Sequence, residues 1–235
     1  VASNNDTTDL GMKWDNQDNG RTLGEVKARG FFSPGTENRP TLTVAVVPTG
    51  LTVNSVQWNI SPARIVIDSL STFIDNILVS SRTKYFRLGG SLSKDPGEKL
   101  TLTFEGLNMS YLNNLLNGKQ DESQESSQLK MEGLLSGNLT LSDVYRNPLF
   151  ESRINVTDFR LNDNNYGLMT ITSEWDPRRK VAVINVGNDY AGRKLIDISG
   201  TYSPSTRVIN IAASAFDLPL DVLNPFLRTF ASDIR

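Results

Sequence analysis

The residue types that most often carry out chemistry in proteins are missing from this chain, because its 235 residues include no histidine and no cysteine. Their absence removes the usual general base, the commonest transition-metal ligand, thiolate nucleophiles and the Ser-His and Cys-His pairs of nucleophilic enzymes. The remaining acids, bases and hydroxyls are scattered through strand and turn patterns without a recognised signature. We therefore expect no catalytic residue, metal site or cofactor, and no enzyme. Only a pair of carboxylates brought together in three dimensions, as glycoside hydrolysis requires, stays open.

An acidic cluster of Asp121, Glu122 and Glu125 could offer oxygen ligands to calcium. It lacks the spaced ligands and the central glycine of a calcium-binding loop. It also lies within Lys119–Gln128 (KQDESQESSQ), a stretch without any apolar residue. We interpret the cluster as part of a solvated, flexible polar loop.

Charge and hydropathy exclude two classes of interaction. The 24 basic and 26 acidic residues are spread along the chain, with a net charge of −2, and form no basic stripe that would neutralise a nucleic-acid backbone. The sequence has no apolar run of about 18 residues and no charged-then-apolar leader, so we expect neither a membrane-spanning segment nor a signal peptide within it. Because the sequence starts at Val1 without a methionine and stops at Arg235 just after an apolar segment, we expect it to be part of a longer protein.

Apolar and polar residues alternate with a period of two from end to end, which predicts an almost all-β fold. The alternating apolar sets are Leu42, Val44 and Val46; Ile65 and Ile67; Leu100, Leu102 and Phe104; Leu139 and Leu141; Ile154 and Val156; Ile196 and Ile198; Ile209 and Ile211. In Ile154–Leu161 the apolar parity changes after Asp158, which fits a β-bulge, an exit from one sheet face or a strand end. Turn residues separate the runs at Asn19-Gly20, Asp95-Pro96-Gly97, Asp176-Pro177 and Ser203-Pro204. We expect antiparallel hairpins or short meanders.

Two segments have apolar residues at helical spacing and predict short helices, Ser110–Gly118 and Leu220–Ala231. Pro225 would kink the second or confine it to its second half. With the polar loop between them, these segments predict a first β-unit at residues 1–118, a flexible loop at 119–128 and a second β-unit at 129–235. Each β-unit would end in a short helix.

An internal repeat relates the two β-units. Gly90-Ser91-Leu92-Ser93 and Gly200-Thr201-Tyr202-Ser203 lie about 110 residues apart, and each precedes a proline turn, an alternating strand and an apolar helix pattern. A weaker third start is Gly30-Phe31-Phe32-Ser33-Pro34. Such a repeat favours units stacked edge to edge over a single closed barrel. The alternative is that the order of glycine, turn and strand recurs in any β protein.

Several short sequence segments, in their order along the chain, resemble those of the TamB family of the AsmA-like superfamily, in the form found in Bacteroidetes-type bacteria. The segments are Leu134–Leu141 (LLSGNLTL), Pro148–Phe150, Ile154–Leu161, Tyr166–Ile171 and Trp175-Asp176. Leu10–Asn16 (LGMKWDN) and Leu51–Ile67, with Trp58-Asn59-Ile60 at its centre, are similar to the same family. The resemblance covers most of the chain and rests on the order and spacing of these short segments.

This resemblance implies a periplasmic segment of a long protein that is anchored in the inner membrane outside this chain. Combined with the strand and helix patterns above, it gives an expected fold that is all-β with two short helices. The resemblance itself implies that the sheet is elongated, curled and mainly antiparallel, and that its repeated strand units form an open groove, or β-taco. The implied function is to carry phospholipid acyl chains between the inner and outer membranes. The implied further role is to assist outer-membrane protein assembly with an Omp85-type partner. No nucleic-acid partner is expected.

An open curled sheet would leave an apolar face that an acyl chain could cover, since acyl chains need no specific polar contact. The candidate groove-lining residues are Leu100, Leu102, Phe104, Leu139, Leu141, Ile154, Val156, Ile196, Ile198, Ile209 and Ile211. Each of them could equally belong to an ordinary dry core. The alternative function is an extracytoplasmic β-sandwich for adhesion or carbohydrate binding, which would need two closed sheets and exposed clustered aromatics.

Overall fold

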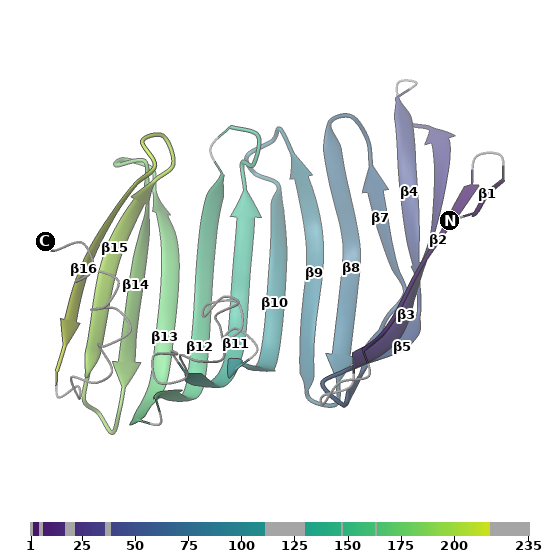
Figure 1. The fold of residues 1–235 in the computed structure, drawn as a ribbon. Helices are drawn as coiled ribbons and strands as arrows, with labels where there is room; N and C mark the ends of the chain where they lie inside the picture. The colour runs from purple at the N-terminus through teal and green to yellow at the C-terminus, as the bar shows by residue number, and fades with distance from the viewer. Residues whose placement is uncertain are drawn as a thin grey trace, which may run out of the picture. The chain divides into compact units, whose positions relative to one another are not determined.

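The structure is a computed structural model that describes residues 2–4, 7–16, 22–35, 39–110, 130–146, 148–162 and 164–216. Within these residues the chain forms sixteen β-strands and no helix (Figure 1), and the strand pairs are antiparallel. The predicted all-β class with repeated antiparallel strands is therefore confirmed. The two predicted helices, apart from Ser110, and the predicted polar loop at 119–128 lie outside the described residues.

The strands are named in chain order. Their bounds are β1 Ala2–Asn4, β2 Thr7–Asn16, β3 Thr22–Pro34, β4 Pro40–Val47, β5 Thr49–Val53, β6 Val56–Ile60, β7 Ala63–Ile67, β8 Ser71–Ser81, β9 Lys84–Ser93, β10 Lys99–Asn108, β11 Met131–Ser142, β12 Leu149–Leu161, β13 Asn164–Asp176, β14 Val181–Asp189, β15 Ile196–Ser203 and β16 Val208–Ala215. Hydrogen-bonded neighbours follow the order β1-β2-β3-β4-β7-β8-β9-β10-β11-β12-β13-β14-β15-β16, with β5 between β3 and β6, and β6 between β5 and β8.

The chain divides into two compact units. Unit 1 comprises residues 1–105 and 138–150, and unit 2 comprises residues 106–137 and 151–235. Strands β1 to β9 belong to unit 1, and β13 to β16 belong to unit 2. The strands β10, β11 and β12 each contribute residues to both units.

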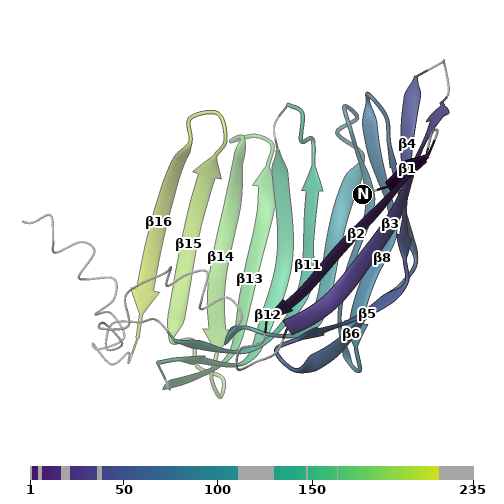
Figure 2. The same ribbon diagram turned by 45° about the vertical axis from the view of Figure 1, so that its right-hand side comes forward.

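Two prolines interrupt the meander of unit 1. Pro48 separates β4 from β5, and Pro62 lies between β6 and β7, so four short strands occupy the place of one long hairpin. Proline has no N–H to donate to a ladder and a restricted φ, and each one therefore ends a strand. The neighbouring strands bridge the breaks: β3 pairs with both β4 and β5, and β8 pairs with both β6 and β7. Figure 2 shows β3 as a long band that bends along its length.

One irregularity and three turns lie where the sequence pattern predicts them, whereas the register shift between Ile74 and Ile77 of β8 is not predicted by it. In β12 the pairing register shifts between Val156 and Phe159, and Asp158 has a φ of 53°. The parity change at Asp158 is therefore a β-bulge, and β12 continues beyond it. The turns at Asp95-Pro96-Gly97, Asp176-Pro177 and Ser203-Pro204 are confirmed. Asp176 Oδ1 accepts hydrogen bonds from the backbone N–H groups of Arg178 and Arg179, as an aspartate at a turn start commonly does. Asn19-Gly20 lies outside the described residues.

The glycines that suggested the repeat each lie in the first strand of a hairpin, opposite an apolar residue of the second strand. Gly30 lies opposite Val44, Gly90 opposite Leu100, and Gly200 opposite Ile211. Each glycine thus faces an apolar residue of the next long strand. Gly90 has a φ of 123°, and a Cβ there would collide with the carbonyl oxygen of Lys99. At this position the close approach of β10 requires glycine.

The most buried part of unit 2 is a cluster of apolar side chains. Its members are Met109, Met131, Val156, Phe159, Tyr166, Met169, Leu195 and Ile196. Val156 has no exposed surface, and the rings of Phe159 and Tyr166 lie 6.1 Å apart. Buried Asn188 fixes the backbone beside the cluster: its Nδ2 donates to Tyr166 O, and its Oδ1 accepts from the N–H groups of Leu195 and Ile196. Buried polar groups are tolerated when paired in this way.

Candidate functional site

The register of unit 1 places apolar residues in rows that cross the sheet. Directly opposed residues of neighbouring antiparallel strands have side chains on the same face. One row contains Gly30, Val44, Ile65, Ile74, Gly90 and Leu100. A second contains Phe32, Leu42 and Ile67, and a third contains Leu88 and Leu102. These rows define the apolar face of unit 1.

Aromatic residues also lie on the apolar face of unit 1. Phe86 is opposite Phe104, and the ring of Trp58 lies 6.2 Å from that of Phe86. Trp14 is opposite Gly24, and its indole occupies the space that a Cβ on this glycine would enter. Trp58 and Phe104 are buried. The aromatic rings therefore form the best-packed part of an otherwise half-buried face.

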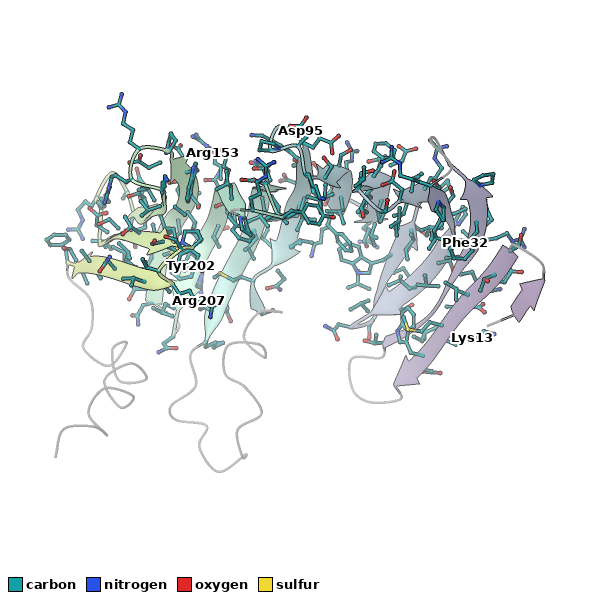
Figure 3. The ribbon with its side chains drawn as sticks, turned by 90° about the horizontal axis from the view of Figure 1, so that it is seen from above. Lys13, Phe32, Asp95, Arg153, Tyr202 and Arg207 are labelled. Atoms are coloured by element: carbon teal, nitrogen blue, oxygen red, sulfur yellow. The ribbon has the colours of Figure 1, made fainter. Side chains whose placement is uncertain are left out.

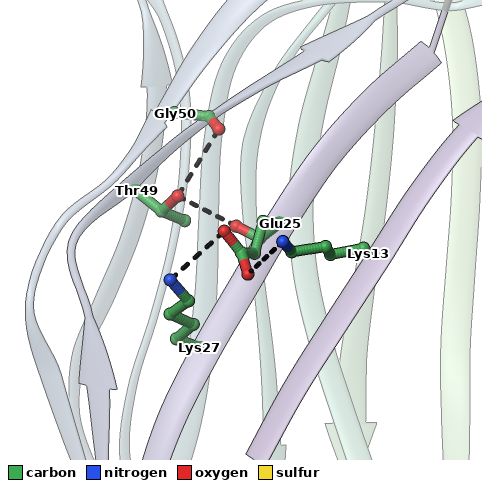
Figure 4. A network of polar contacts seen from close by, with 5 residues as sticks. All are labelled: Lys13, Glu25, Lys27, Thr49 and Gly50. Atoms are coloured by element: carbon green, nitrogen blue, oxygen red, sulfur yellow. Dashed lines mark hydrogen bonds and ion pairs between the residues drawn. The ribbon is translucent and has the colours of Figure 1, made fainter.

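Charged residues of β2 and β3 lie on the opposite, polar face of unit 1. Asp9 is opposite Arg29, and the Arg29 Nε lies 2.7 Å from the Asp9 carboxylate. The Glu25 carboxylate forms ion pairs with Lys13 of β2 and with Lys27 of its own strand, each with an N···O distance of 3.2 Å (Figure 4). Exposed pairs of this kind contribute little stability. Their effect is to mark this face as the solvated one.

The ion pairs also perturb ionisation on the polar face. Burial opposes ionisation of Glu25, but the hydrogen bonds and charges of Lys13 and Lys27 outweigh it and hold the pKa of this carboxyl below its ordinary value. Hydrogen bonding to Asp9 raises the pKa of Arg29. Both groups are therefore kept charged. The polar face of unit 1 also carries some apolar residues: Phe31, Val66 and Phe73 share a side with Thr43, and Leu78 lies opposite Arg87.

Unit 2 repeats the same two-faced pattern. A row of five apolar residues crosses five strands, formed by Ile154, Ile171, Val186, Ile198 and Ala213. The adjacent position on each strand forms a polar row of Arg153, Thr172, Asn185 and Ser199, which ends at Ala212. Tyr202, from the apolar face, and Arg153, from the polar face, are labelled in Figure 3. Unit 2 therefore also has one apolar face and one polar face.

The apolar faces have no second layer of secondary structure over them in the part of the chain that is described, since that part forms a single sheet without helices. Side chains at the margins are consequently open to solvent. Met12 is 62% and Phe32 57% exposed in unit 1, while Ile209 is 62% and Ile211 70% exposed in unit 2. Most of the remaining apolar-face residues are half-buried by their neighbours within the sheet.

All eleven candidate lining residues lie on the apolar face of their own unit. In unit 1, Leu100, Leu102 and Phe104 belong to the rows above. Thr101 and Thr140 share the polar face, with hydroxyl oxygens 3.3 Å apart, so alternation places Leu139 and Leu141 on the apolar face. The remaining candidates line the apolar face of unit 2: Ile154, Val156, Ile196, Ile198, Ile209 and Ile211.

Exposure separates the eleven candidates into two groups. Phe104, Val156 and Ile196 are buried by protein atoms, and the last two belong to the cluster of unit 2. They have little surface left for a ligand and act as packing residues. The other eight are half-buried or exposed. These eight residues are available to an apolar ligand.

The candidate set omitted apolar-face residues of the first strands. Leu10, Met12 and Trp14 alternate on β2 and share the face of Val26 and Ala28. Their period of two is visible in the sequence, but it is short and is flanked by charges. Phe32 follows Phe31 directly, so the two residues point to opposite faces although nothing in their type distinguishes them. Only the register with Leu42 assigns Phe32 to the apolar face.

An open cavity of about 390 Å³ on the polar face of unit 2 contains Lys194 and Asp197, which pair with each other at 2.8 Å and are about half exposed. Within the described ranges, no group of three or more acidic side chains could hold a metal ion. In the same ranges, no helix has the length and apolar character needed to cross a bilayer. The unusual surfaces of this part are thus the two apolar faces.

No family model, curated protein or solved structure matches this chain.

Proposed function

We propose that this chain is a periplasmic segment of a TamB-like bridge protein whose apolar sheet faces carry phospholipid acyl chains between the inner and outer membranes. The observation that supports this proposal is that each unit has one apolar face with no second layer over it in the described residues. Anchoring in the inner membrane and assistance to outer-membrane protein assembly by an Omp85-type partner belong to the same proposal and rest on the resemblance alone.

The physical chemistry of acyl chains suits such a face. Burial of a methylene from water contributes about 0.8 kcal/mol and requires no directed polar contact. An acyl chain that moves from a bilayer onto an apolar sheet exchanges one apolar environment for another, so the net free energy change is much smaller. A carrier needs this balance, because tight binding would stop onward movement. Rows of half-buried aliphatic residues would give this small net free energy of transfer without a specific binding site.

The polar faces fit the same proposal. The charged residues of β2 and β3 and the polar row of unit 2 would stay in water while the opposite face holds lipid. The sandwich module, in contrast, needs a second sheet packed on the apolar face. The described residues form one sheet, and this observation favours the carrier over the adhesion or carbohydrate-binding module.

Two adjacent phenylalanines of β3 allow a matched test. Phe32 lies on the apolar face and is 57% exposed, while Phe31 lies on the polar face and is 39% exposed. The full chain and the variants Phe32→Glu and Phe31→Glu are incubated with vesicles of phosphatidylethanolamine and phosphatidylglycerol. Bound phospholipid is then counted by native mass spectrometry, and circular dichroism checks that both variants fold.

We expect bound phospholipid on the wild-type chain, a reduced amount on Phe32→Glu and the wild-type amount on Phe31→Glu. A charge on the apolar face would lose its hydration when an acyl chain covers it, whereas a charge on the polar face stays in water. A chain that binds no phospholipid, or an equal loss in the two folded variants, would contradict the proposal.

A further inference from the structure

Among the described residues, the strand β16 lies at an edge of the sheet and carries none of the charges, prolines or bulges that usually protect an edge strand. Among the described residues it pairs with β15 alone, and all eight of its residues are exposed. Its sequence, VINIAASA, contains no charged residue and no proline. Native proteins normally protect a sheet edge with charges, prolines, bulges or a covering element, because a free edge is a template for another strand.

The edge at the other end of the strand order, formed by β1 and β2, has such protection. The strand β2 carries Asp9, Lys13 and Asp15, and β1 pairs with its first three residues. The contrast makes β16 the edge that is suited to accept a partner strand.

The pair that follows β16 shows which of its residues form hydrogen bonds with β15 and which face away from it. The Phe216 N–H donates to Leu195 O at 2.8 Å, in register with the pairs of β15 and β16. Hydrogen-bonded and non-hydrogen-bonded pairs alternate in an antiparallel ladder. Even-numbered residues of β16 therefore bond to β15. Odd-numbered residues direct their N–H and C=O groups to the free edge: Ile209, Ile211, Ala213 and Ala215.

The outward-directed residues of β16 can pair with the outward-directed residues of an identical, antiparallel β16. When β16 lies antiparallel to an identical strand with Ala212 opposite Ala212, Ile209 faces Ala215 and Ile211 faces Ala213. Large and small side chains then alternate across the contact, and the pairing joins residues that both present free backbone groups. On the other face Asn210 meets Ser214. No like charges oppose each other, since the strand has none.

We infer that β16 is a self-association edge that pairs antiparallel with β16 of a second copy of this chain, about a two-fold axis at Ala212. The axis is perpendicular to the sheet, because opposed residues of antiparallel strands share a face. The two Ile211 side chains therefore lie on the same side of the joined sheet. The partner strand extends the apolar face at this edge and satisfies its backbone groups.

Single cysteines test the pairing directly, because the natural chain has none. At the axis, Ala212 forms a non-hydrogen-bonded pair with its counterpart, with Cα atoms about 4.5 Å apart, within the range of about 4.4–6.8 Å that a disulfide spans. The Ala212→Cys variant of this 235-residue chain is oxidised at low concentration and analysed by non-reducing electrophoresis. Asn210→Cys is the matched control, since residue 210 faces residue 214 and lies far from its own counterpart.

We expect a disulfide-linked dimer of Ala212→Cys and little or none of Asn210→Cys. The wild-type chain should sediment at about twice its monomer mass of 26.0 kDa. Ala213→Pro removes only an outward N–H and should cause loss of the dimer with an unchanged circular dichroism spectrum. A monomeric wild-type chain, or equal or preferred cross-linking at residue 210, would overturn the inference. Loss of phospholipid binding in a chain that still dimerises would refute the proposed function alone.

Discussion

Truncation of Val156 tests whether the buried cluster holds unit 2 together. Val156 has no exposed surface and packs among the cluster residues, with Gly133 so close that a Cβ on this glycine would lie 2.6 Å from Val156 Cγ1. The substitution Val156→Ala removes two methyl groups. Their transfer free energy is about 1.6 kcal/mol, and a cavity of about 50 Å³ adds about 1 kcal/mol. We expect a loss of about 2–3 kcal/mol in the free energy of unfolding.

Val208 provides the matched control for this deletion. It also belongs to unit 2, but it is 48% exposed on β16, so removal of the same two methyl groups should cost no more than about 0.5 kcal/mol. The measurement is urea unfolding followed by far-ultraviolet circular dichroism, with the midpoint and slope compared among the three chains. If Val156→Ala destabilises the protein no more than Val208→Ala does, the cluster is not the core of unit 2.

Two further perturbations address the backbone and the pH dependence. Gly90→Ala should lower the free energy of unfolding by about 1–3 kcal/mol, because the φ of 123° is strained for alanine and the added Cβ meets the backbone of Lys99. Gly11→Ala, with open space around it, should be nearly neutral. Similar urea midpoints for the two variants would show that residue 90 does not require glycine. Hydrogen bonds from the backbone N–H groups of Leu70 and Ser71 lower the pKa of Asp68 from 3.8. Its contribution to stability is therefore complete above pH 3.8 and is lost as the pH falls through the lowered folded pKa. Asp68→Asn should reduce this acid-induced loss in urea midpoints, and an unchanged pH profile would contradict the argument.

The sheet faces could be predicted from the sequence because the period of a strand is fixed by its pleat. Leu100 and Leu102, or Ile196 and Ile198, must share a face once they lie in a strand. The change of parity after Asp158 left a β-bulge, an exit from the sheet face and a strand end open, and the register shift within β12 shows that it is a bulge.

Burial and strand breaks could not be predicted in the same way. Val156 and Ile211 have similar sequence patterns, yet one is fully buried and the other is 70% exposed. The difference depends on residues distant in sequence, such as Gly133 in β11 and the absence of a second neighbour for β16 among the described residues. Pro48 and Pro62 can end a strand or occupy a turn with equal ease, so the split of one hairpin into four strands becomes visible only in the pairing.

The central claim is that lipid lies on the apolar faces, and site-specific photocross-linking tests it most directly. Leu102 and Thr103 are adjacent on β10, and the pairs with Leu88 and Arg87 place them on opposite faces of unit 1. A photoreactive amino acid is placed at each position in turn, and the chain is irradiated with vesicles that contain an alkyne-tagged phospholipid. We predict that position 102 acquires the tag and position 103 does not. Equal labelling at both positions, or labelling only at position 103, would contradict the account.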